Sequence, residues 1–553
     1  MAYKSVRPHV IPEIKEWPIH RLYRDRSGIV QEVVDATVRH FMKLDVEEQS
    51  NVLARASYLE RIRIKEEPWK VDPPDDDAFW KGVRRNIARE SLDAETEADE
   101  QANNQEQYER IVRRYAEEIA GGFKKNSFVF ARKFLTALFK QLLNRASGRN
   151  LGRIWGSRLE LYDRFHVYGE VTLLRQLVSK GTVVLLPTHS SNLDSILIGY
   201  ALDAIVGIPA FSYGAGLNLY NTGATAFYMN RLGAYRVDRR KKNDIYLQTL
   251  KEYSRLTMER GVHSLFFPGG TRSRSGELEH KLKLGLLGTV IQAQRNNYLN
   301  GTDEKIFIVP LVLSYHFVLE AKSLIQQHLK RTGEELYVQQ KENDNGVAKL
   351  TKFLWQFFSA SSDVSLTIGR PFDVIGNYVD ADGNSLGHHG KKTSLREYFM
   401  HKGRINADSQ REQQYTRRLA DIVARRYKAE NVVLSSHVVA LVGFRMLRAQ
   451  NPDLDLYAVL RLPNNEFEVP FGQFCEGVRE VRNKLLELEE DEEIRLSPEL
   501  ELPIPELTRD GIDSLGTYHV KFPLVIQGDK VVSQSFDLLY FYHNRLSVYD
   551  LWG

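Results

Sequence analysis

The sequence predicts an α/β protein: a mixed sheet flanked by helices, preceded by a helical region and followed by a helix-rich one. Strand-like apolar runs alternate with helical runs through the middle of the chain, the pattern of a sheet with helices on both faces. Residues before this alternation are polar and helix-prone, and those after it carry mostly helical patterns. The chain of 553 residues is too long for one core, so we expect three regions, 1–120, 121–375 and 376–553.

The first region is expected to be helical with a polar connection. Pro73-Pro74 and the aspartates that follow predict a break, and the polar run 95–107 has the composition of either a linker or a solvated helix. Neither stretch carries side chains typical of a reactive site. We therefore expect no chemistry in this region.

A basic amphipathic helix is expected over 128–143, where apolar residues recur at helical spacing. Such a helix can lie on an anionic membrane surface, or it can pack on the core with its basic face in water. Both interpretations are compatible with one helix. The cations in and beside it are Lys124, Lys125, Arg132, Lys133, Lys140 and Arg145.

The middle region is expected to contain strands at 182–187, 204–211, 234–237, 264–267, 306–314 and 364–368. Helices between them are expected at 195–202, 244–260 and 282–294. Sites on such sheets lie outside the carboxyl ends of the strands. Residues that directly follow the strands at 182–187 and 264–267 can therefore share one crevice.

The last region begins with a loop at 380–392 and continues with helical patterns. The stretch 432–447 is apolar nearly all round, which is typical of a buried helix. An acidic run at 487–493 separates it from strand-like runs at 522–526 and 536–542. We interpret this part as an accessory region.

Composition restricts the class of protein. A net charge of only +4 argues against a general nucleic-acid binder, so we expect no nucleic-acid partner. The single cysteine, Cys475, cannot form an intrachain disulfide, and the chain starts Met-Ala-Tyr-Lys without the apolar core of a secretion signal, which favours the cytoplasm. No apolar run suits a membrane span, since the uncharged stretch 204–230 is interrupted by glycine, proline and asparagine.

The first candidate reactive group is His189, which follows the strand at 182–187 with Asp194 five residues later. A carboxylate bonded to one ring nitrogen fixes the tautomer of a histidine and leaves the other nitrogen as a general base near neutral pH. A nucleophilic Ser190 or Ser191 is disfavoured, because adjacent side chains rarely face each other and no Gly-x-Ser-x-Gly turn surrounds them. We expect His189 to activate a substrate hydroxyl, with backbone amides near Ser190 as oxyanion donors.

The second candidate site is an anion cradle after the strand at 264–267. Glycines let the backbone approach a phosphate closely, and arginines bind its oxygens in a bidentate manner. The basic run 240–242 fits a solvated surface better, and Lys281 and Lys283 are second choices. The expected phosphate-binding residues are Arg239, Gly270, Thr271, Arg272, Ser273 and Arg274.

With these segments in this order, the sequence resembles the glycerol-3-phosphate acyltransferases, a branch of the glycerolipid and lysophospholipid acyltransferases. That family has a His-x4-Asp block, a Gly-aromatic block ending in arginine, a Phe-x-Glu-Gly-x-Arg-Ser block and a strand with Val-Pro. Pro310, Tyr315 and Glu320 are similar to the Pro-x4-Tyr-x4-Glu pattern of this branch, and 540–544 is similar to its terminal Tyr-Tyr-Arg-Asn. The four blocks correspond to 189–194, 233–239, 267–274 and 308–311.

The resemblance implies an enzyme that moves an acyl group from acyl-CoA or acyl-carrier protein to the sn-1 hydroxyl of glycerol 3-phosphate. The product would be lysophosphatidate, for phospholipid biosynthesis, and the enzyme would be peripheral on the cytoplasmic face of a membrane. Catalysis would fall to His189 and Asp194, with Pro310 as a further site candidate. The acceptor could instead be lysophosphatidate or dihydroxyacetone phosphate. An alternative of another class is a non-catalytic protein that binds lipids or acyl thioesters.

One position departs from the family pattern, and two further features can be explained by packing or by solvent exposure alone. Gly269 stands where the family usually has glutamate, so that carboxylate is absent or supplied elsewhere. Gly214-Ala215-Gly216 could line an acyl tunnel or simply pack in the core. His388-His389 lacks carboxylate or cysteine partners at ligand spacing, so we expect no metal and no resident cofactor.

Overall fold

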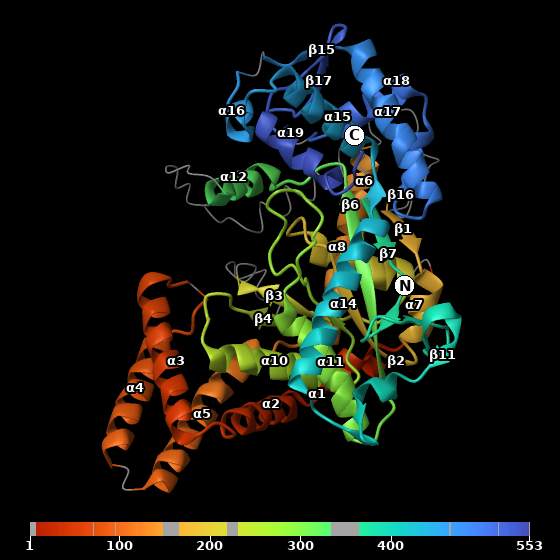
Figure 1. The fold of residues 1–553 in the computed structure, drawn as a ribbon. Coiled ribbons are helices and arrows are strands. Elements are labelled where there is room, and N and C mark those ends of the chain that lie inside the picture. The colour runs from red at the N-terminus through yellow and green to blue at the C-terminus, as the bar shows by residue number, and fades with distance from the viewer. Residues whose placement is uncertain are drawn as a thin grey trace.

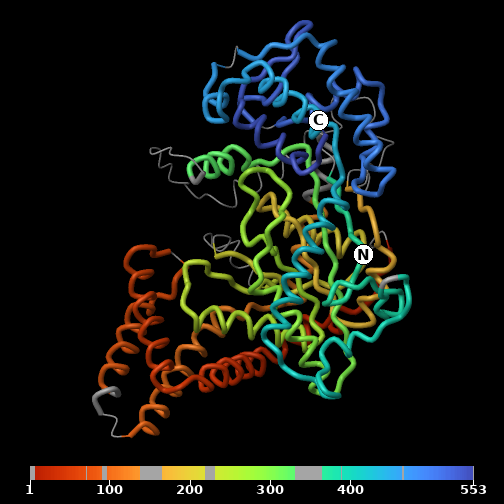
Figure 2. Tube along the Cα trace, viewed as in Figure 1, coloured from red at the N-terminus to blue at the C-terminus, as the bar shows by residue number. Residues whose placement is uncertain are grey.

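The computed structural model describes residues 7–69, 71–93, 96–146, 165–217, 231–332, 364–463, 466–517 and 519–551. The last part of the uncharged stretch 204–230, residues 218–230, lies outside these residues. Figure 1 shows N-terminal helices at the lower left, a central sheet, and a helical C-terminal part at the top. The trace in Figure 2 follows the same path.

Within the described residues, the central sheet is mixed and has eleven strands in the order β11-β10-β9-β8-β6-β2-β5-β3-β4, with β7 also paired to β6 and β1 paired to β7. β2 is parallel to both β6 and β5, and β3 is parallel to β5 and β4, whereas β7 runs antiparallel to β6. The strands are β1 Phe165–Gly169, β2 Gly181–Pro187, β3 Ser212–Gly216, β4 Ala234–Val237, β5 Ser264–Leu265, β6 Lys305–Tyr315, β7 Val364–Ile368, β8 Phe372–Asp373, β9 Tyr378–Val379, β10 Ser385–Leu386 and β11 Lys392–Thr393.

Helices cover both faces of this sheet, which confirms the predicted fold class. Successive side chains of a strand point to opposite faces, and Val183 and Leu185 of β2 join one core cluster while Val184 and Leu186 join another. The first cluster includes side chains of α7 (Val171–Leu177) and α8 (Asp194–Ala201). The second includes side chains of α10 (Asp244–Glu259), α11 (Leu284–Leu299) and α14 (Ser409–Ala429).

The helices of the N-terminal region pack on α10 and share one core cluster with it. This region contains η1 (Ile14–Glu16), α1 (Pro18–Arg24), α2 (Arg26–Phe41), α3 (Val46–Glu66), α4 (Asp76–Asp93) and α5 (Glu97–Ile119), followed by α6 (Lys125–Ala146). The predicted break at Pro73-Pro74 is the connection between α3 and α4. Most of the polar run 95–107 belongs to α5, so the linker interpretation is wrong: Thr96 caps the helix, and Asn104 and Gln107 are buried.

The C-terminal part is mostly helical. Its helices after α12 (Ala321–Thr332) and α14 are α15 (Ser435–Gln450), α16 (Leu456–Leu460), α17 (Phe471–Glu490), α18 (Ile504–Ser514) and α19 (Phe536–His543). Small sheets pair β12 (Met400–His401) with β13 (Arg404–Ile405), and β14 (Val432–Val433) with β16 (Arg495–Leu496). A third joins β15 (Glu468–Pro470), β18 (Lys530–Val532) and β17 (Val525–Gln527), and short turns of 3-10 helix lie at His388–Gly390, Leu395–Phe399, Pro498–Glu501 and Asn544–Leu546.

Two predicted strands are helical instead. The segment 536–542 forms α19, which packs on the buried helix α15 that the sequence predicted. In the run 204–211 the first residues complete a helical segment, Leu202–Val206, which ends at Gly207 with φ 72°, and the strand starts only at Ser212. Short, uniformly apolar runs carry no period that separates a buried strand from a buried helix. In the described residues, no helix has the run of apolar side chains that crossing a bilayer requires.

Candidate functional site

The turn between β2 and α8 holds His189 and Asp194 in direct contact. Nδ1 of His189 lies 2.8 Å from Oδ2 of Asp194, and the aspartate side chain is fully buried. An ionised carboxylate can only accept hydrogen bonds, so Nδ1 carries the proton and Nε2 is left with a lone pair. The imidazole also stacks on the ring of Phe267, with 4.1 Å between ring centres. The arrangement is that of a general base with a fixed tautomer.

Asp194 is also held from the backbone and from β6. The N–H groups of Ser190 and Ser191 donate to its Oδ2 at 2.7 Å and 3.0 Å, and the hydroxyl of Tyr315 donates to Oδ1. These amides are therefore engaged by Asp194, so the expectation that they serve as oxyanion donors is wrong. Burial, and then the charge of Asp194, raises the pKa of Tyr315 well above its ordinary value, so the hydroxyl stays protonated and donates.

Glu320 connects this turn to the arginine loop. Its carboxylate accepts from Ser191 Oγ at 3.0 Å, from the N–H of Asn192 at 3.1 Å and from Nη1 of Arg272 at 3.2 Å. In the sequence, Tyr315 and Glu320 are informative only as part of the Pro-x4-Tyr-x4-Glu pattern, which indicates the branch of the family. The contacts of Tyr315 and Glu320 with the turn that carries His189 could not be read from the sequence, because the partners are more than a hundred residues away.

A pocket of about 330 Å³ brings the predicted base and the predicted arginines together. His189, Arg239, Thr271, Arg272 and Arg274 all line it. Burial, followed by the charges of Arg272 and Arg274, lowers the pKa of Arg239. Three guanidinium groups thus converge on one space, and Arg239 has no ion pair among the described residues. This is the electrostatic environment that an anion such as phosphate requires.

The remaining predicted phosphate-binding residues support the loop without lining the pocket. Gly270 adopts φ 77°, a conformation that favours glycine, and the N–H of Ser273 donates to the carbonyl of His189 at 2.8 Å. Lys281 and Lys283 are exposed outside the pocket lining, and Pro310 is buried in β6 opposite Leu186 of β2.

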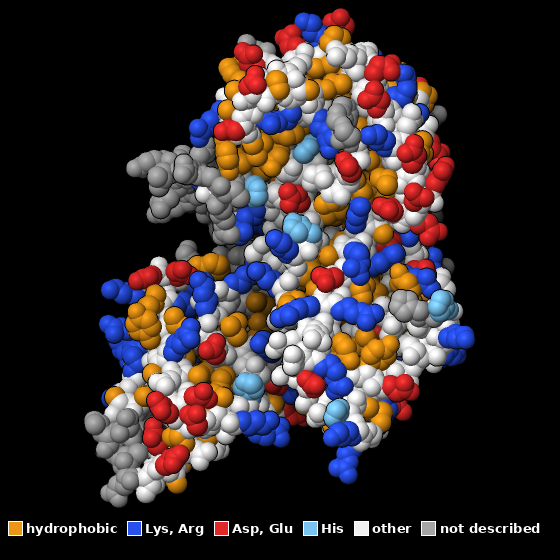
Figure 3. Space-filling view, in the orientation of Figure 1, with side chains coloured by type: hydrophobic (Ala, Val, Ile, Leu, Met, Phe, Trp, Pro, Cys, Tyr) orange, Lys and Arg blue, Asp and Glu red, His pale blue; other side chains and the backbone are white. Residues whose placement is uncertain are grey.

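The apolar wall of the pocket comes from β3 and its surroundings. Gly214, Ala215, Gly216 and Leu217 line it together with Phe267. The segment 214–216 thus borders the pocket, and Ala215 is also buried in a core cluster. In the space-filling view, Lys and Arg side chains surround a hollow in this part of the molecule (Figure 3).

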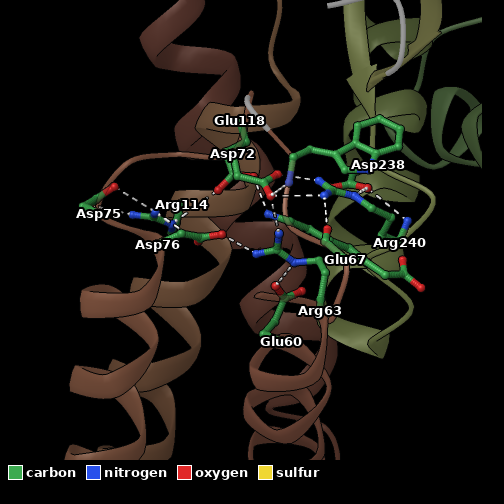
Figure 4. Close-up of polar contacts among 12 residues, drawn as sticks. Glu60, Arg63, Glu67, Asp72, Asp75, Asp76, Arg114, Glu118, Asp238 and Arg240 are labelled. Carbon is green, nitrogen blue, oxygen red and sulfur yellow. Dashed lines mark hydrogen bonds and ion pairs between the residues drawn. The ribbon is translucent and has the colours of Figure 1, made fainter. Parts of the chain in front are cut away.

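The N-terminal region also reaches the pocket, which the sequence did not predict. Glu67 and Trp69, in the connection after α3, line the pocket, and the Trp69 ring lies 4.5 Å from the guanidinium of Arg240. Arg240 binds both Asp238 and Asp72 (Figure 4). The sequence shows acidic residues in 72–77 and basic residues in 236–242, but nothing in it indicates that the two segments contact each other.

The expectation of a solvated basic run is therefore wrong for two of its three residues. Arg240 is ion-paired and mostly buried, and Lys241 is buried and paired with Glu118 of α5. Lys242 is exposed and lines the pocket. The segment that carries Arg239 is thus anchored on the N-terminal helices.

The C-terminal segment contacts the arginine loop and the loop that follows β6. Asn544 donates to the carbonyl of Ser275 at 2.9 Å, and the N–H of Val318 donates to the hydroxyl of Tyr542 at 2.9 Å. A Cβ at Gly276 would lie 2.1 Å from the carbonyl oxygen of Phe541, so a glycine permits this close approach. The similarity of 540–544 to a family pattern thus has a structural counterpart.

Known proteins resemble the part of the chain that builds this pocket. Residues 164–314 match a family model described as Acyltransferase. A glycerol-3-phosphate acyltransferase of Alteromonas mediterranea is 28% identical over 253 residues, which cover 44% of this chain and 26% of that protein. One from Pseudomonas aeruginosa is 26% identical over 245 residues, with 44% and 26% covered, and one from Pseudoalteromonas translucida is 28% identical over 214 residues, with 38% and 23% covered.

The matched region spans about a quarter of the length of these relatives. It contains β2, the turn with His189 and Asp194, the arginine loop and most of β6. Residues 164–314 therefore match the Acyltransferase family model, and part of this chain is similar to part of each of these glycerol-3-phosphate acyltransferases.

Proposed function

We propose that this protein transfers a fatty acyl group from acyl-CoA or acyl-carrier protein to the sn-1 hydroxyl of glycerol 3-phosphate, forming lysophosphatidate. The observation that carries the proposal is the pocket in which the His189 base faces the same space as Arg239, Arg272 and Arg274. A base and an anion site side by side suit an acceptor with a hydroxyl and a phosphate. The names of the relatives agree with this acceptor.

The reaction would proceed by direct attack of the acceptor. Nε2 of His189 removes the proton of the hydroxyl while its oxygen attacks the carbonyl carbon of the acyl thioester. The ester C–O bond forms, the C–S bond breaks, and the proton passes from the imidazolium to the leaving thiolate. General-base help contributes about 10²- to 10⁴-fold, so positioning of the phosphate supplies a further share of the rate. The acyl thioester is a co-substrate, and we expect no resident cofactor.

A matrix of acceptors and donors tests the function. Purified protein is assayed with glycerol 3-phosphate, dihydroxyacetone phosphate and lysophosphatidate, each with acyl-CoA and acyl-carrier protein. We expect turnover with glycerol 3-phosphate, and a His189→Ala variant should lose about 10²- to 10⁴-fold in kcat. Turnover with lysophosphatidate alone would overturn the acceptor, and equal rates for wild type and His189→Ala would remove His189 as the base. No turnover with any pair of substrates would leave a non-catalytic binding protein.

The phosphate site is tested by Arg272→Ala. Loss of a charge-assisted contact should raise the acceptor KM and lower kcat/KM by about 10- to 100-fold. The control is Lys322→Ala, which removes an exposed cation at the start of α12 that does not line the pocket. Unchanged acceptor kinetics in Arg272→Ala would remove this side chain from the phosphate site.

We also propose peripheral binding to the cytoplasmic face of an anionic membrane through α6. Phe130 and Phe134 are 56% and 48% exposed and stack with 6.5 Å between ring centres, while Lys124 and Lys133 are exposed nearby. Other side chains of α6, including Phe128 and Leu135, pack on the protein core, so one helix serves both purposes. Flotation with anionic vesicles but not neutral ones is expected, and Phe130→Ala with Phe134→Ala should abolish it. Equal flotation of the double variant would exclude this surface.

A further inference from the structure

A buried carboxyl group lies directly behind the catalytic turn. Oε1 of Glu279 accepts the backbone N–H of His189 at 3.1 Å. The residue as a whole is half-buried, but its Oε2 is fully buried and has no hydrogen-bond partner among the described residues. Glu279 does not line the pocket, so it would not touch a substrate there.

Both backbone groups of His189 are held by the loop that follows β5. The carbonyl of His189 accepts from the N–H of Ser273 at 2.8 Å, and its N–H donates to Glu279. The side chain is held by Asp194 and Phe267. The direction in which Nε2 points therefore depends on the position of the Glu279 carboxyl group.

The space that Glu279 fills belongs geometrically to position 269. A Cβ built on Gly269 would lie 2.6 Å from Oε1 of Glu279, and its three nearest heavy atoms all belong to this carboxyl group. Any side chain at 269 would therefore displace Glu279. The missing side chain at 269 and the buried one at 279 are complementary in shape.

We infer that Glu279 is a positioning residue for His189, and that it delivers from ten residues downstream a carboxyl group into the space beside position 269. This role rests on the proposed acyl transfer. It also accounts for a glycine at position 269, because the Glu279 carboxyl group fills the space that a side chain there would occupy. Gly269 is then required by Glu279 and not by backbone strain.

The surroundings of the carboxyl group agree with this role. Charged or titratable side chains close enough to act on it, or to be acted on by it, are Asp194, Arg545 and Tyr427. Burial, opposed by the His189 N–H, raises the pKa of Glu279 to about 8. The group is therefore mostly neutral at pH 7, accepts the N–H through its carbonyl oxygen and avoids repulsion with Asp194.

A pair of matched variants tests the positioning role. Glu279→Gln keeps an oxygen acceptor, and Glu279→Met keeps the volume without it. We expect Glu279→Gln to hold kcat within about threefold of wild type and Glu279→Met to lower it about 10- to 100-fold, with acceptor KM changed little. Equal kcat values for the two variants, or a loss confined to KM, would overturn the inference. Melting curves establish that both variants are folded at the assay temperature.

A double-mutant cycle tests the shared space. Gly269→Ala should lower the melting temperature in the wild-type background but much less in a Glu279→Ala background, where the carboxyl group is gone. Additive effects would contradict the shared space. The exchange variant, Gly269→Glu with Glu279→Ala, should have a kcat at least about tenfold higher than that of Glu279→Ala alone. A kcat no higher than that of Glu279→Ala would contradict the equivalence of the two positions.

The outcome separates this inference from the proposed function. If wild type turns over no acceptor, the acyl-transfer proposal fails, while the coupling of melting temperatures between positions 269 and 279 still reports on the shared space. If wild type is active and Glu279→Met matches it, only the positioning role fails.

Discussion

Asp194 is the residue around which the reactive turn is organised. It lies in the first turn of α8, where the helix dipole favours a carboxylate, and it accepts from His189, from two backbone N–H groups and from Tyr315. Because its oxygens are fully used, it cannot rotate without losing several bonds. A fixed carboxylate fixes the imidazole, and a fixed imidazole is what a general base needs.

The hydroxyl of Tyr315 should contribute to kcat without contacting substrate. Tyr315→Phe removes one donor to Asp194 and keeps the ring, so we expect a loss of about tenfold in kcat at unchanged acceptor KM. Steady-state kinetics with varied glycerol 3-phosphate measures both. Tyr298→Phe, which alters a buried tyrosine of α11 outside the pocket lining, is the control. A rise in KM with normal kcat would argue against an action through Asp194.

The raised pKa of Glu279 should appear in the stability of the protein. The folded state holds the proton up to about pH 8, whereas the unfolded chain releases it near 4.5. Between these values the unfolded state is ionised and the folded state is not, so stability falls as pH rises, by at most about 1.4 kcal/mol per pH unit. Below pH 4.5 both states are protonated, and this contribution is fully present.

Glu279→Gln removes this titration. Its free energy of unfolding, relative to wild type, should therefore increase from pH 5 to pH 8. Urea unfolding at several pH values measures the difference. A difference that stays constant over this range would show that the carboxyl group is not buried in its neutral form.

The contact between His189 and Asp194 could be predicted from the sequence because it is local. His189 and Asp194 are five residues apart on one turn, and Arg272 directly follows two glycines and a threonine. Glu279, by contrast, acts on a backbone group 90 residues earlier, and Tyr315 acts on a carboxylate 121 residues earlier. Such contacts depend on which strands are neighbours in the sheet, and a single sequence does not specify this.

At the scale of elements, the best predictions are those of long buried strands. β4 and β7 begin and end where expected, β2 begins one residue earlier, and β6 is one residue longer at each end, because runs of β-branched and aromatic side chains bounded by turns favour strands. The segment 536–542 is equally apolar but forms α19. Packing against α15 decides its conformation, and local preference alone could not.

The connection between α3 and α4 is the element that ties the N-terminal helices to the site. Asp72 lies between Arg63 and Arg240, and both arginines are mostly buried. Asp72→Asn removes their shared partner, while Arg63 keeps Glu60 and Asp76 and Arg240 keeps Asp238, so the loss of this charged hydrogen bond should destabilise the protein by about 2 kcal/mol. Because Arg239 immediately precedes Arg240, the acceptor KM should rise as well.

A surface ion pair of the same region provides the control. Asp77 and Lys81 are both more than half exposed, so Asp77→Asn should change stability by less than about 1 kcal/mol and leave KM unchanged. Chemical unfolding and acceptor kinetics measure both effects. An Asp72→Asn variant as stable and as active as Asp77→Asn would show that the network does not support Arg239.

For the whole molecule, the pocket is where the regions meet. The N-terminal region provides Trp69, the central sheet provides His189 and Arg239, and the C-terminal segment holds the loops through Asn544 and Tyr542. A ligand in this pocket contacts walls from different parts of the chain. Its binding should therefore stabilise these parts together, even though a chain of this size can unfold in more than one step.

Thermal unfolding with glycerol 3-phosphate tests this coupling. At a concentration of about 100 times Kd, a ligand that binds only the folded state stabilises it by about 2.7 kcal/mol. We expect the transition of the N-terminal helices to move upward with that of the central sheet, since Trp69 and Arg239 share the pocket. Trp69 fluorescence cannot be isolated among six tryptophans, so hydrogen exchange of α3 and α4 is the better measurement. Protection confined to the central sheet would mean that the N-terminal wall does not take part in binding, and an Arg239→Ala variant should show no protection in either part because it lacks a cation that the phosphate requires.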